Sequence, residues 1–435
     1  MERNVKNLED FFWKFLLINP ILDILNGFYI HYLTTVFGNV YEDSGLAVTP
    51  TLAFRMGVLV LFAVYLLRLR DRKAVLTVLP MGAAWVLSVV SELVIGQPMS
   101  IFTDVQYFAK FLYNIAVVLA YTQLFHRCGL GREALLKKLN KIITVTLILL
   151  SLAILIPYAF GAGLTTYADR FGYRGARGYF YSGNDITAIF MLLLPIACTY
   201  FMNMQEKDIP RKKKLFYAIA PAFTCICLCL IGTKTAFISV GVTVIALVLY
   251  SLLEYIRKKN RVYLRRILLI IVVTLLVLVV LSLINQSLLA DISESFGTAS
   301  EVAERDGLET AILSGRQEKF GNAFSQFQEN RPISYLFGIG RGSQEFVVEM
   351  DVFEVLFYYG VFGAIAMLWM YVKLGVGFFL KFWKNINIRT LGVLLSLVLC
   401  AGYLFIAGHV LFSVTSGFYF ALMLVYSTLI LKKSE

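Results

Sequence analysis

Apolar residues run through this chain in long blocks that short polar segments interrupt. A helix needs about 20 mainly apolar residues to cross the hydrocarbon core of a bilayer. Twelve blocks approach or exceed that length, and they lie at residues 11–36, 51–69, 74–95, 104–125, 141–161, 184–204, 213–231, 235–256, 264–287, 352–380, 389–408 and 410–431. The pattern therefore predicts an all-α polytopic membrane protein with about twelve transmembrane helices.

One polar interruption is much longer than the others and covers residues 288–350. It divides the chain into transmembrane helices 1–9 over residues 1–287, a large loop with short amphipathic helices, and transmembrane helices 10–12 over residues 351–435. We expect no soluble domain beyond this loop.

A surface helix is predicted in the middle of the large loop. Phe320, Phe324 and Phe327 recur there at helical spacing. Ser314 precedes them, and serine is a residue type that often caps a helix N-terminus. We therefore expect an amphipathic helix that starts at a Ser314 cap and lies on the membrane surface.

Lys and Arg are concentrated in alternate turns of the chain. The turns after the second, fourth, sixth and eighth apolar blocks are strongly basic, whereas residues 37–50 and 96–103 contain neither Lys nor Arg. Basic loops stay on the cytoplasmic side of a membrane. The pattern therefore places both termini in the cytoplasm and residues 288–350 outside.

Composition supports this class and excludes several functions. Of 435 residues, 59% are hydrophobic and 16% charged, and the net charge is +12, whereas globular domains hold about 25% charged residues. The basic turns explain the positive charge, so we expect no nucleic-acid partner. Most of the six cysteines lie in apolar runs and the three histidines are scattered, so neither a disulfide framework nor a metal site is predicted. His409, at an outer turn, either contacts substrate or is an interface residue, and the second is the more common case.

Positive charge on the outer side opposes the orientation rule and therefore suggests a ligand. Arg170, Arg174 and Arg177 cluster in the segment YADRFGYRGARGYFYSGND, before the sixth helix. Arginine offers paired donors that match phosphate oxygens, and a lipid-linked pyrophosphate at the outer leaflet is a suitable anion. Alternatively, these arginines are solvated and pair with Asp169 and Asp185.

Two lysines point to a polar cavity that opens outward. Lys234 begins the eighth helix, where a cation opposes the helix dipole unless an anion shares the site; simple snorkelling to the interface is the alternative. Lys110 lies deeper, in the outer third of the fourth helix. A buried lysine costs roughly 2.5–3.5 kcal/mol at the bilayer centre, so we expect water or a ligand to reach it. Asp23, in the first helix, fits either this cavity or a buried structural pair.

Three motifs in the second half of the chain carry a family resemblance. They are Arg174…Gly178…Asn184-Asp185, Gly232-Thr233-Lys234-Thr235-Ala236, and Ser314-Gly315-Arg316 followed by Leu336-Phe337-Gly338-Ile339-Gly340 and Gly360-x-x-Gly363. With the twelve-helix layout and the large outer loop, they resemble the O-antigen ligase and O-antigen polymerase superfamily of bacterial surface-polysaccharide enzymes.

The chain also departs from the family pattern. The first motif has one inserted residue, and Lys234 stands where the family usually has Arg. Glu349 lies eleven residues before Gly360, at a position where the ligases carry a His that is implicated in activating the acceptor. This last departure favours a polymerase-type member over a strict ligase.

The resemblance implies a GT-C-like, metal-independent glycosyltransferase at the outer face of the bacterial cytoplasmic membrane, with no cofactor. Its donor would be a glycan on undecaprenyl pyrophosphate, and its acceptor a sugar hydroxyl on a second lipid-linked repeat unit. The product would be a capsule, exopolysaccharide or O-antigen chain. Membrane lipid, a chain-length regulator and a flippase are the partners that such a reaction implies.

The resemblance and the charge pattern together assign roles to residues. Glu349 is the candidate base that deprotonates the acceptor hydroxyl, with Asp351 as the second choice. Alternatively, both acids only begin a helix, because carboxylates are favoured at helix N-termini. The candidates for binding pyrophosphate are Arg174, Arg177, Lys234 and Arg316, and the further candidates for the cavity are Arg170, Asn184, Arg341, Glu354, Tyr358 and Lys110.

Three other functions remain open from the sequence. A ligase-type enzyme would transfer the lipid-linked glycan to a different surface acceptor. A flippase or transporter of lipid-linked sugars would also need a cationic cavity, although such folds often contain internal repeats, and none is evident here. An older type of multi-helix glycosyltransferase would instead use Glu42 and Asp43 in the first outer loop, with a divalent metal.

Overall fold

The computed structural model describes residues 2–37, 49–97, 99–167, 174–204, 211–342 and 348–431. These residues form helices and their connections, with a single isolated bridge between Thr165 and Ala176. Four residues named from the sequence, Glu42, Asp43, Asp169 and Arg170, lie outside the described residues.

Among the described residues, nine long helices come first along the chain. They are α1 (Glu2–Phe37), α2 (Pro50–Arg68), α3 (Arg72–Val94), α4 (Ile101–Arg127), α5 (Arg132–Ala159), α6 (Gly183–Asn203), α7 (Arg211–Ile231), α8 (Lys234–Lys258) and α9 (Val262–Ile284). In the described part of the chain, four helices of the large loop and three further apolar helices follow. They are α10 (Leu288–Asp306), α11 (Leu308–Leu313), α12 (Arg316–Glu329), α13 (Ile333–Phe337), α14 (Asp351–Phe382), α15 (Ile388–Ile406) and α16 (Ser416–Ile430).

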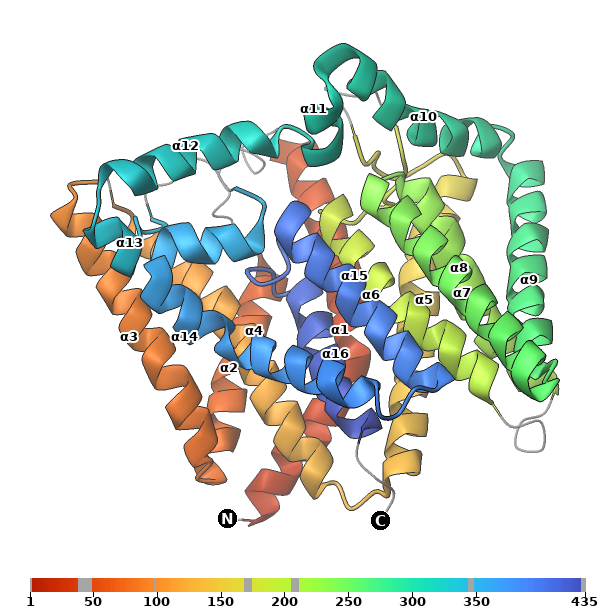
Figure 1. Cartoon of the computed structure of the whole chain (residues 1–435), viewed down its shortest axis with the longest axis horizontal. Helices are drawn as coiled ribbons and strands as arrows, with labels where there is room; N and C mark the ends of the chain where they lie inside the picture. Colours follow the sequence, from red (N-terminus) through yellow and green to blue (C-terminus); the bar gives the residue numbers. More distant parts are fainter. Residues whose placement is uncertain are drawn as a thin grey trace.

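The predicted class, an all-α polytopic membrane protein, is confirmed. Among the described residues, 11 helices are long and apolar enough to cross a membrane, and α16 is a shorter apolar helix of 15 residues. Nearly every residue of α16 is buried, and Figure 1 shows it inside the bundle, among α1, α4 and α15.

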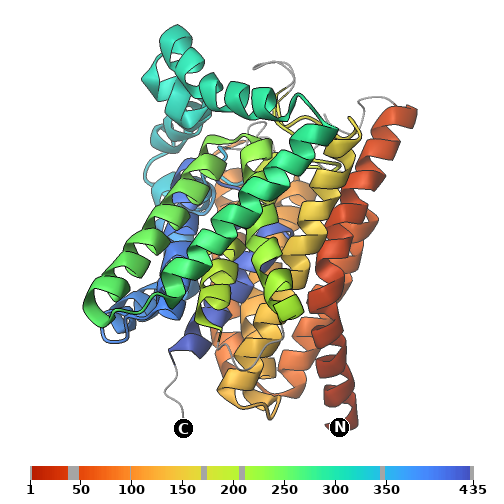
Figure 2. The same cartoon turned by 90° about the vertical axis from the view of Figure 1, so that its right-hand side faces the viewer.

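The four loop helices cover one end of the bundle. In Figures 1 and 2, α10–α13 lie across the top, whereas both termini lie at the bottom. The predicted surface helix is present as α12, and its Phe320 packs edge-on against Phe353 of α14, with ring centroids 5.2 Å apart. The predicted Ser314 cap is wrong. Ser314 has a left-handed backbone (φ 58°) that ends α11, and Gly315 precedes α12 without a side-chain cap.

A break in α14 connects the large loop to the bundle. Gly360 departs from helical geometry (φ 66°, ψ −173°), and the carbonyls of Phe357 and Tyr358 accept the backbone N–H groups of Ile339 and Gly340 at 2.9 and 3.1 Å. Backbone groups freed inside a membrane need such partners. The Gly338-Ile339-Gly340 and Gly360 motifs therefore form one junction, which sets the first turns of α14 beside the bundle end under the loop.

Candidate active site

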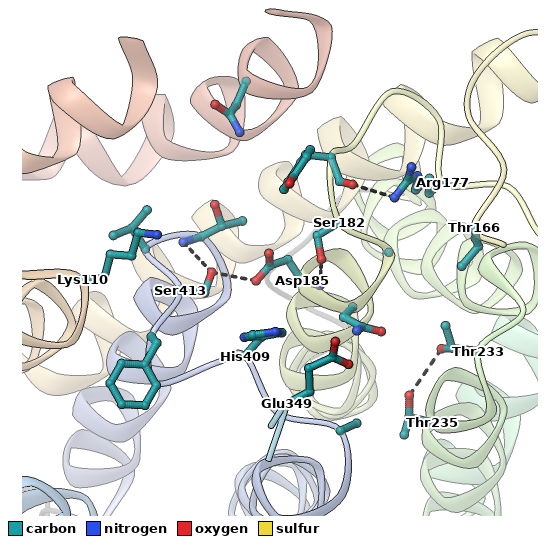
Figure 3. Close-up of a pocket in the computed structure, with 18 of the residues that line it drawn as sticks. Lys110, Thr166, Arg177, Ser182, Asp185, Thr233, Thr235, Glu349, His409 and Ser413 are labelled. Carbon is teal, nitrogen blue, oxygen red and sulfur yellow. Dashed lines mark hydrogen bonds between the residues drawn. The ribbon is translucent and has the colours of Figure 1, made fainter. Parts of the chain in front are cut away.

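A cavity of about 660 Å³ opens at the covered end of the bundle. Its walls come from distant parts of the chain: α1, α2, α4, the segment leading into α6, the start of α8, the α11–α12 junction, and residues 406–415. Figure 3 shows the polar side chains that reach it. This is the polar cavity that the charged residues of the sequence suggested.

Three of the predicted pyrophosphate-binding cations line this cavity: Arg177, Lys234 and Arg316. One Arg177 nitrogen donates to the carbonyl of Tyr181 at 2.6 Å, and the Lys234 amine donates to the hydroxyl of Ser314 at 3.2 Å. Each cation comes from a different segment, so only the folded chain brings them together. Together they provide strong hydrogen-bond donors for an anion in one cavity.

Local backbone geometry explains how the first two cations are held. Gly178 (φ 60°) lies so close to α5 that a side chain there would meet the carbonyl oxygen of Ala153 at 2.4 Å, and this close approach carries Arg177 to the cavity wall. The hydroxyl of Thr233 caps α8 by accepting the N–H of Ala236 at 3.2 Å. Lys234 is therefore the first residue of α8, at a helix end that favours anions.

Glu349 also lines the cavity and is held by two cations. Its carboxylate oxygens lie 2.8 Å from the Arg316 guanidinium and 2.8 Å from the Lys319 amine. Burial raises the pKa of this carboxyl, but its cationic neighbours, Arg316 first among them, outweigh burial and hold the pKa below its ordinary value. The residue that the sequence assigned as a base is thus tied directly to the candidate anion site.

Asp351 takes a different position from Glu349. It is fully buried, and its carboxylate accepts the backbone N–H groups of His409 at 3.0 Å and Val410 at 2.7 Å. A third N–H, from Leu411, lies at 3.3 Å. Asp351 therefore fixes the turn at the end of α15 and does not line the cavity.

The turn that Asp351 holds carries His409, which the sequence did not select as a catalytic residue. His409 lines the cavity, and Figure 3 shows its imidazole between Glu349 and Asp185. Asp185 accepts hydroxyl hydrogen bonds from Ser413 at 2.7 Å and Ser416 at 2.5 Å. The sequence signal was weak, because His409 is separated from Glu349 by the whole of α14 and α15.

Other predicted residues divide between the cavity and its surroundings. Asn184 and Lys110 line the cavity, and the Lys110 amine lies 5.0 Å from the centre of the Tyr107 ring. Arg174 instead faces a separate cavity of about 250 Å³ and pairs with Glu301 at 2.9 Å.

Three further candidates form the packing behind the cavity. Arg341 is buried with its guanidinium 4.1 Å from the centre of the Tyr107 ring and 5.3 Å from that of Tyr358. Glu354 is buried and accepts the backbone N–H of Glu349 at 3.0 Å. Arg341, Glu354 and Tyr358 therefore support the site without lining it. Asp23 forms a buried ion pair with Arg55, another residue of the cavity wall.

Backbone strain concentrates at this cavity. Five non-glycine residues of the described chain have positive φ: Arg70, Lys259, Ser314, Glu349 and His409. The last three, at 58°, 61° and 72°, all line the cavity. Such conformations cost of order 1–3 kcal/mol each and gather at functional sites.

The comparison with protein families agrees with the site and the fold. A family model described as "O-antigen ligase like membrane protein" matches residues 5–294 and 294–434. The chain belongs to this family. The resemblance drawn from the three motifs is therefore confirmed.

Family membership defines the chemistry in broad terms. Members of the O-antigen ligase-like family are membrane proteins associated with transfer of a lipid-linked glycan, which makes a lipid-linked glycan the substrate class here. Comparisons with curated proteins and with solved structures found no match. The choice between polymerase and ligase, and the roles of individual residues, therefore depend on this chain's own geometry.

Proposed function

We propose that this protein joins lipid-linked oligosaccharide repeat units, in the manner of a polymerase, at the outer face of the bacterial cytoplasmic membrane. The donor is a glycan on undecaprenyl pyrophosphate, and the acceptor is a sugar hydroxyl of a second lipid-linked unit. A chain-length regulator and a flippase are the partner proteins that this activity implies.

The observation that carries this proposal is the convergence of Arg177, Lys234 and Arg316 in one cavity. Transfer from a lipid pyrophosphate releases an anion, and donors placed where that negative charge develops lower the barrier. Guanidinium groups match phosphate oxygens in pairs. Because these side chains can supply the positive charge, the proposal includes no metal, and we expect transfer to continue in the presence of a chelator.

Glu349 links anion binding to the acceptor side of the reaction. Arg316 contacts Glu349 at 2.8 Å, so a pyrophosphate that draws Arg316 away would remove one counter-ion from this carboxylate. A carboxylate that loses a positive neighbour becomes a stronger base. Glu349 thus has two candidate roles, proton acceptor or counter-ion for Arg316 and Lys319. Asp351 is not carried into the mechanism, because its carboxylate binds backbone N–H groups.

The first test is reconstitution of the purified protein with undecaprenyl-pyrophosphate repeat units and measurement of chain growth. Arg177→Gln should lower the rate about 10- to 100-fold, the range expected when a hydrogen bond to a charged group is lost. Arg331→Gln is the matched control, because Arg331 packs on the Tyr335 ring at 4.8 Å, away from the cavity. Equal rates for Arg177→Gln and the wild type would contradict the proposed anion site.

The second test separates polymerase from ligase. A strain that lacks this protein should display single repeat units if the protein is a polymerase. Long lipid-linked chains without attachment to a surface acceptor would identify it as a ligase instead. The presence of Glu349, where the ligases carry a His, supports the polymerase reading.

A further inference from the structure

We propose that His409 takes the proton from the attacking hydroxyl, and that Glu349 beside it is a positioning residue for Arg316 and Lys319. The inference rests on the glycan transfer proposed above and names the proton acceptor of that reaction. Three features of the described residues support it: the place of the imidazole, the backbone that presents it, and the two ion pairs that engage Glu349. The chemistry of the step is the fourth argument.

The side chain of His409 lies on the wall of the cavity. It is half-buried, and Figure 3 places it between Glu349 and Asp185. Neither ring nitrogen forms a hydrogen bond or an ion pair with a residue that the structure describes. A ring nitrogen is therefore available to a hydroxyl that enters the cavity, and imidazole is the side chain most often used for proton transfer.

The backbone around His409 is arranged to present this side chain. His409 has a left-handed conformation (φ 72°), its N–H is bound by Asp351 at 3.0 Å, and its carbonyl accepts the Ser416 hydroxyl at 3.1 Å. The preceding Gly408 (φ 45°) packs so tightly that a side chain there would meet the backbone of Glu349 at 2.5 Å. The turn is thus locked onto the Glu349 segment with its imidazole in the cavity.

Glu349 is poorly placed to accept the proton itself. One carboxylate oxygen contacts Lys319 and the other contacts Arg316, both at 2.8 Å. The release of Arg316 to a bound pyrophosphate would still leave Lys319 in place. A carboxylate in this position holds the two cations next to the anion site, and its negative charge favours the imidazolium that forms beside it.

The glycan transfer needs no reactant beyond the donor and the acceptor. The O–H bond of the acceptor hydroxyl breaks, and the proton moves to a ring nitrogen of His409. The hydroxyl oxygen forms a bond to the anomeric carbon of the donor glycan. The bond from that carbon to the pyrophosphate oxygen breaks, and the lipid pyrophosphate leaves with the electron pair toward Arg177 and Arg316. The imidazolium then returns its proton to water.

The test compares the wild type with His409→Asn in proteoliposomes that contain undecaprenyl-pyrophosphate repeat units. Asparagine tolerates the left-handed backbone of this position but is not basic. We expect kcat to fall by about 100-fold or more, the lower end of what a general base contributes, with little change in the KM for the donor. His31→Asn is the matched control, because His31 lies on α1 against the Tyr179 ring and does not line the cavity.

A pH profile separates the imidazole from the acids around it. Because a neutral imidazole is needed, the kcat/KM of the wild type should fall toward acid pH. This fall should be absent from the residual activity of His409→Asn and present in Glu349→Gln. Glu349, just before α14, and Asp351, its first residue, interact electrostatically with His409. The other charged groups to consider are Asp185 of α6, Lys110 of α4 and Arg316 of α12, which line the same cavity.

Chemical rescue provides a second variant if His409→Asn does not fold. His409→Gly also tolerates positive φ and leaves space for free imidazole, which should restore part of the activity. Without added imidazole, turnover by either His409 variant within about threefold of the wild type would overturn the inference. So would a fall of kcat/KM toward acid pH that disappears in Glu349→Gln but remains in His409→Asn. Absence of transfer by the wild type would refute the proposed function itself, so the two failures are distinguishable.

Discussion

Glu349 and Asp351 are two residues apart in the sequence, but their carboxylates bind different kinds of group. Glu349 faces cations at the cavity, whereas Asp351 is buried against the backbone N–H groups of the turn at His409. The sequence could rank both as acids near a helix start but could not separate an ionised cavity residue from a backbone anchor. The neighbours that distinguish them come from α12 and from the segment after α15.

The ion pairs of Glu349 predict a pH dependence of stability. Its folded-state pKa is held below the ordinary value of 4.5, so the folded protein binds the proton less readily than the unfolded chain does. The pairs therefore contribute stability fully above the unfolded pKa, and that contribution is lost as the pH falls through the folded pKa. Thermal unfolding of the wild type below pH 4.5 should show this loss.

The Glu349→Gln variant is the control for this pH dependence. A glutamine cannot titrate, so the variant should be less stable than the wild type near neutral pH and should approach it as the pH falls. An equal acid dependence in the two proteins would contradict a stabilising role of the ion pairs.

At the scale of elements, the break in α14 decides where the site is built. The second half of α14 packs in the bundle, whereas its first turns carry Asp351 and Glu354 under the loop helices. Gly360 makes this possible, because its φ of 66° is unfavourable for other residues and its neighbour Phe337 leaves no room. The glycine spacing in the sequence indicated a family motif but not this junction.

Gly360→Ala should destabilise the protein by about 2 kcal/mol or more, because an L-residue loses 1–2 kcal/mol in a left-handed conformation and the new methyl group would lie 2.4 Å from the Phe337 nitrogen. Thermal unfolding in detergent measures the change.

Gly375→Ala is the matched control for Gly360→Ala, because Gly375 lies in the same helix with nothing within 4 Å of an added methyl group. That change should leave stability equal or raise it by about 0.5–1 kcal/mol. Similar unfolding temperatures for the two variants would show that the junction contributes little.

Across the molecule as a whole, the two ends of the helical bundle carry different features. One end carries the cavity under α10–α13, and the other carries both termini. The basic turns predict that the termini face the cytoplasm and the cavity faces outward. This orientation is what a substrate at the outer leaflet requires.

Cysteine labelling in intact cells tests the orientation. In a Cys128→Ser background, Glu309→Cys in α11 should react with a membrane-impermeant maleimide, since Glu309 is exposed on the loop layer. Lys137→Cys, exposed in α5 near the opposite end, should react only after the cells are permeabilised. The reverse labelling pattern would place the cavity on the cytoplasmic side.

The sequence alone determined the class, the long helices, the large loop and the family, because these depend on local hydrophobicity, local charge and motif order. It also selected Arg177, Lys234, Arg316, Glu349 and Lys110, which do line one cavity. Only the tertiary structure separated them from Arg174, Arg341, Asp351, Glu354 and Tyr358, and added His409. The physical reason is that proximity across a helical bundle depends on how helices pack and where α14 breaks, and neither is encoded in residue spacing along the chain.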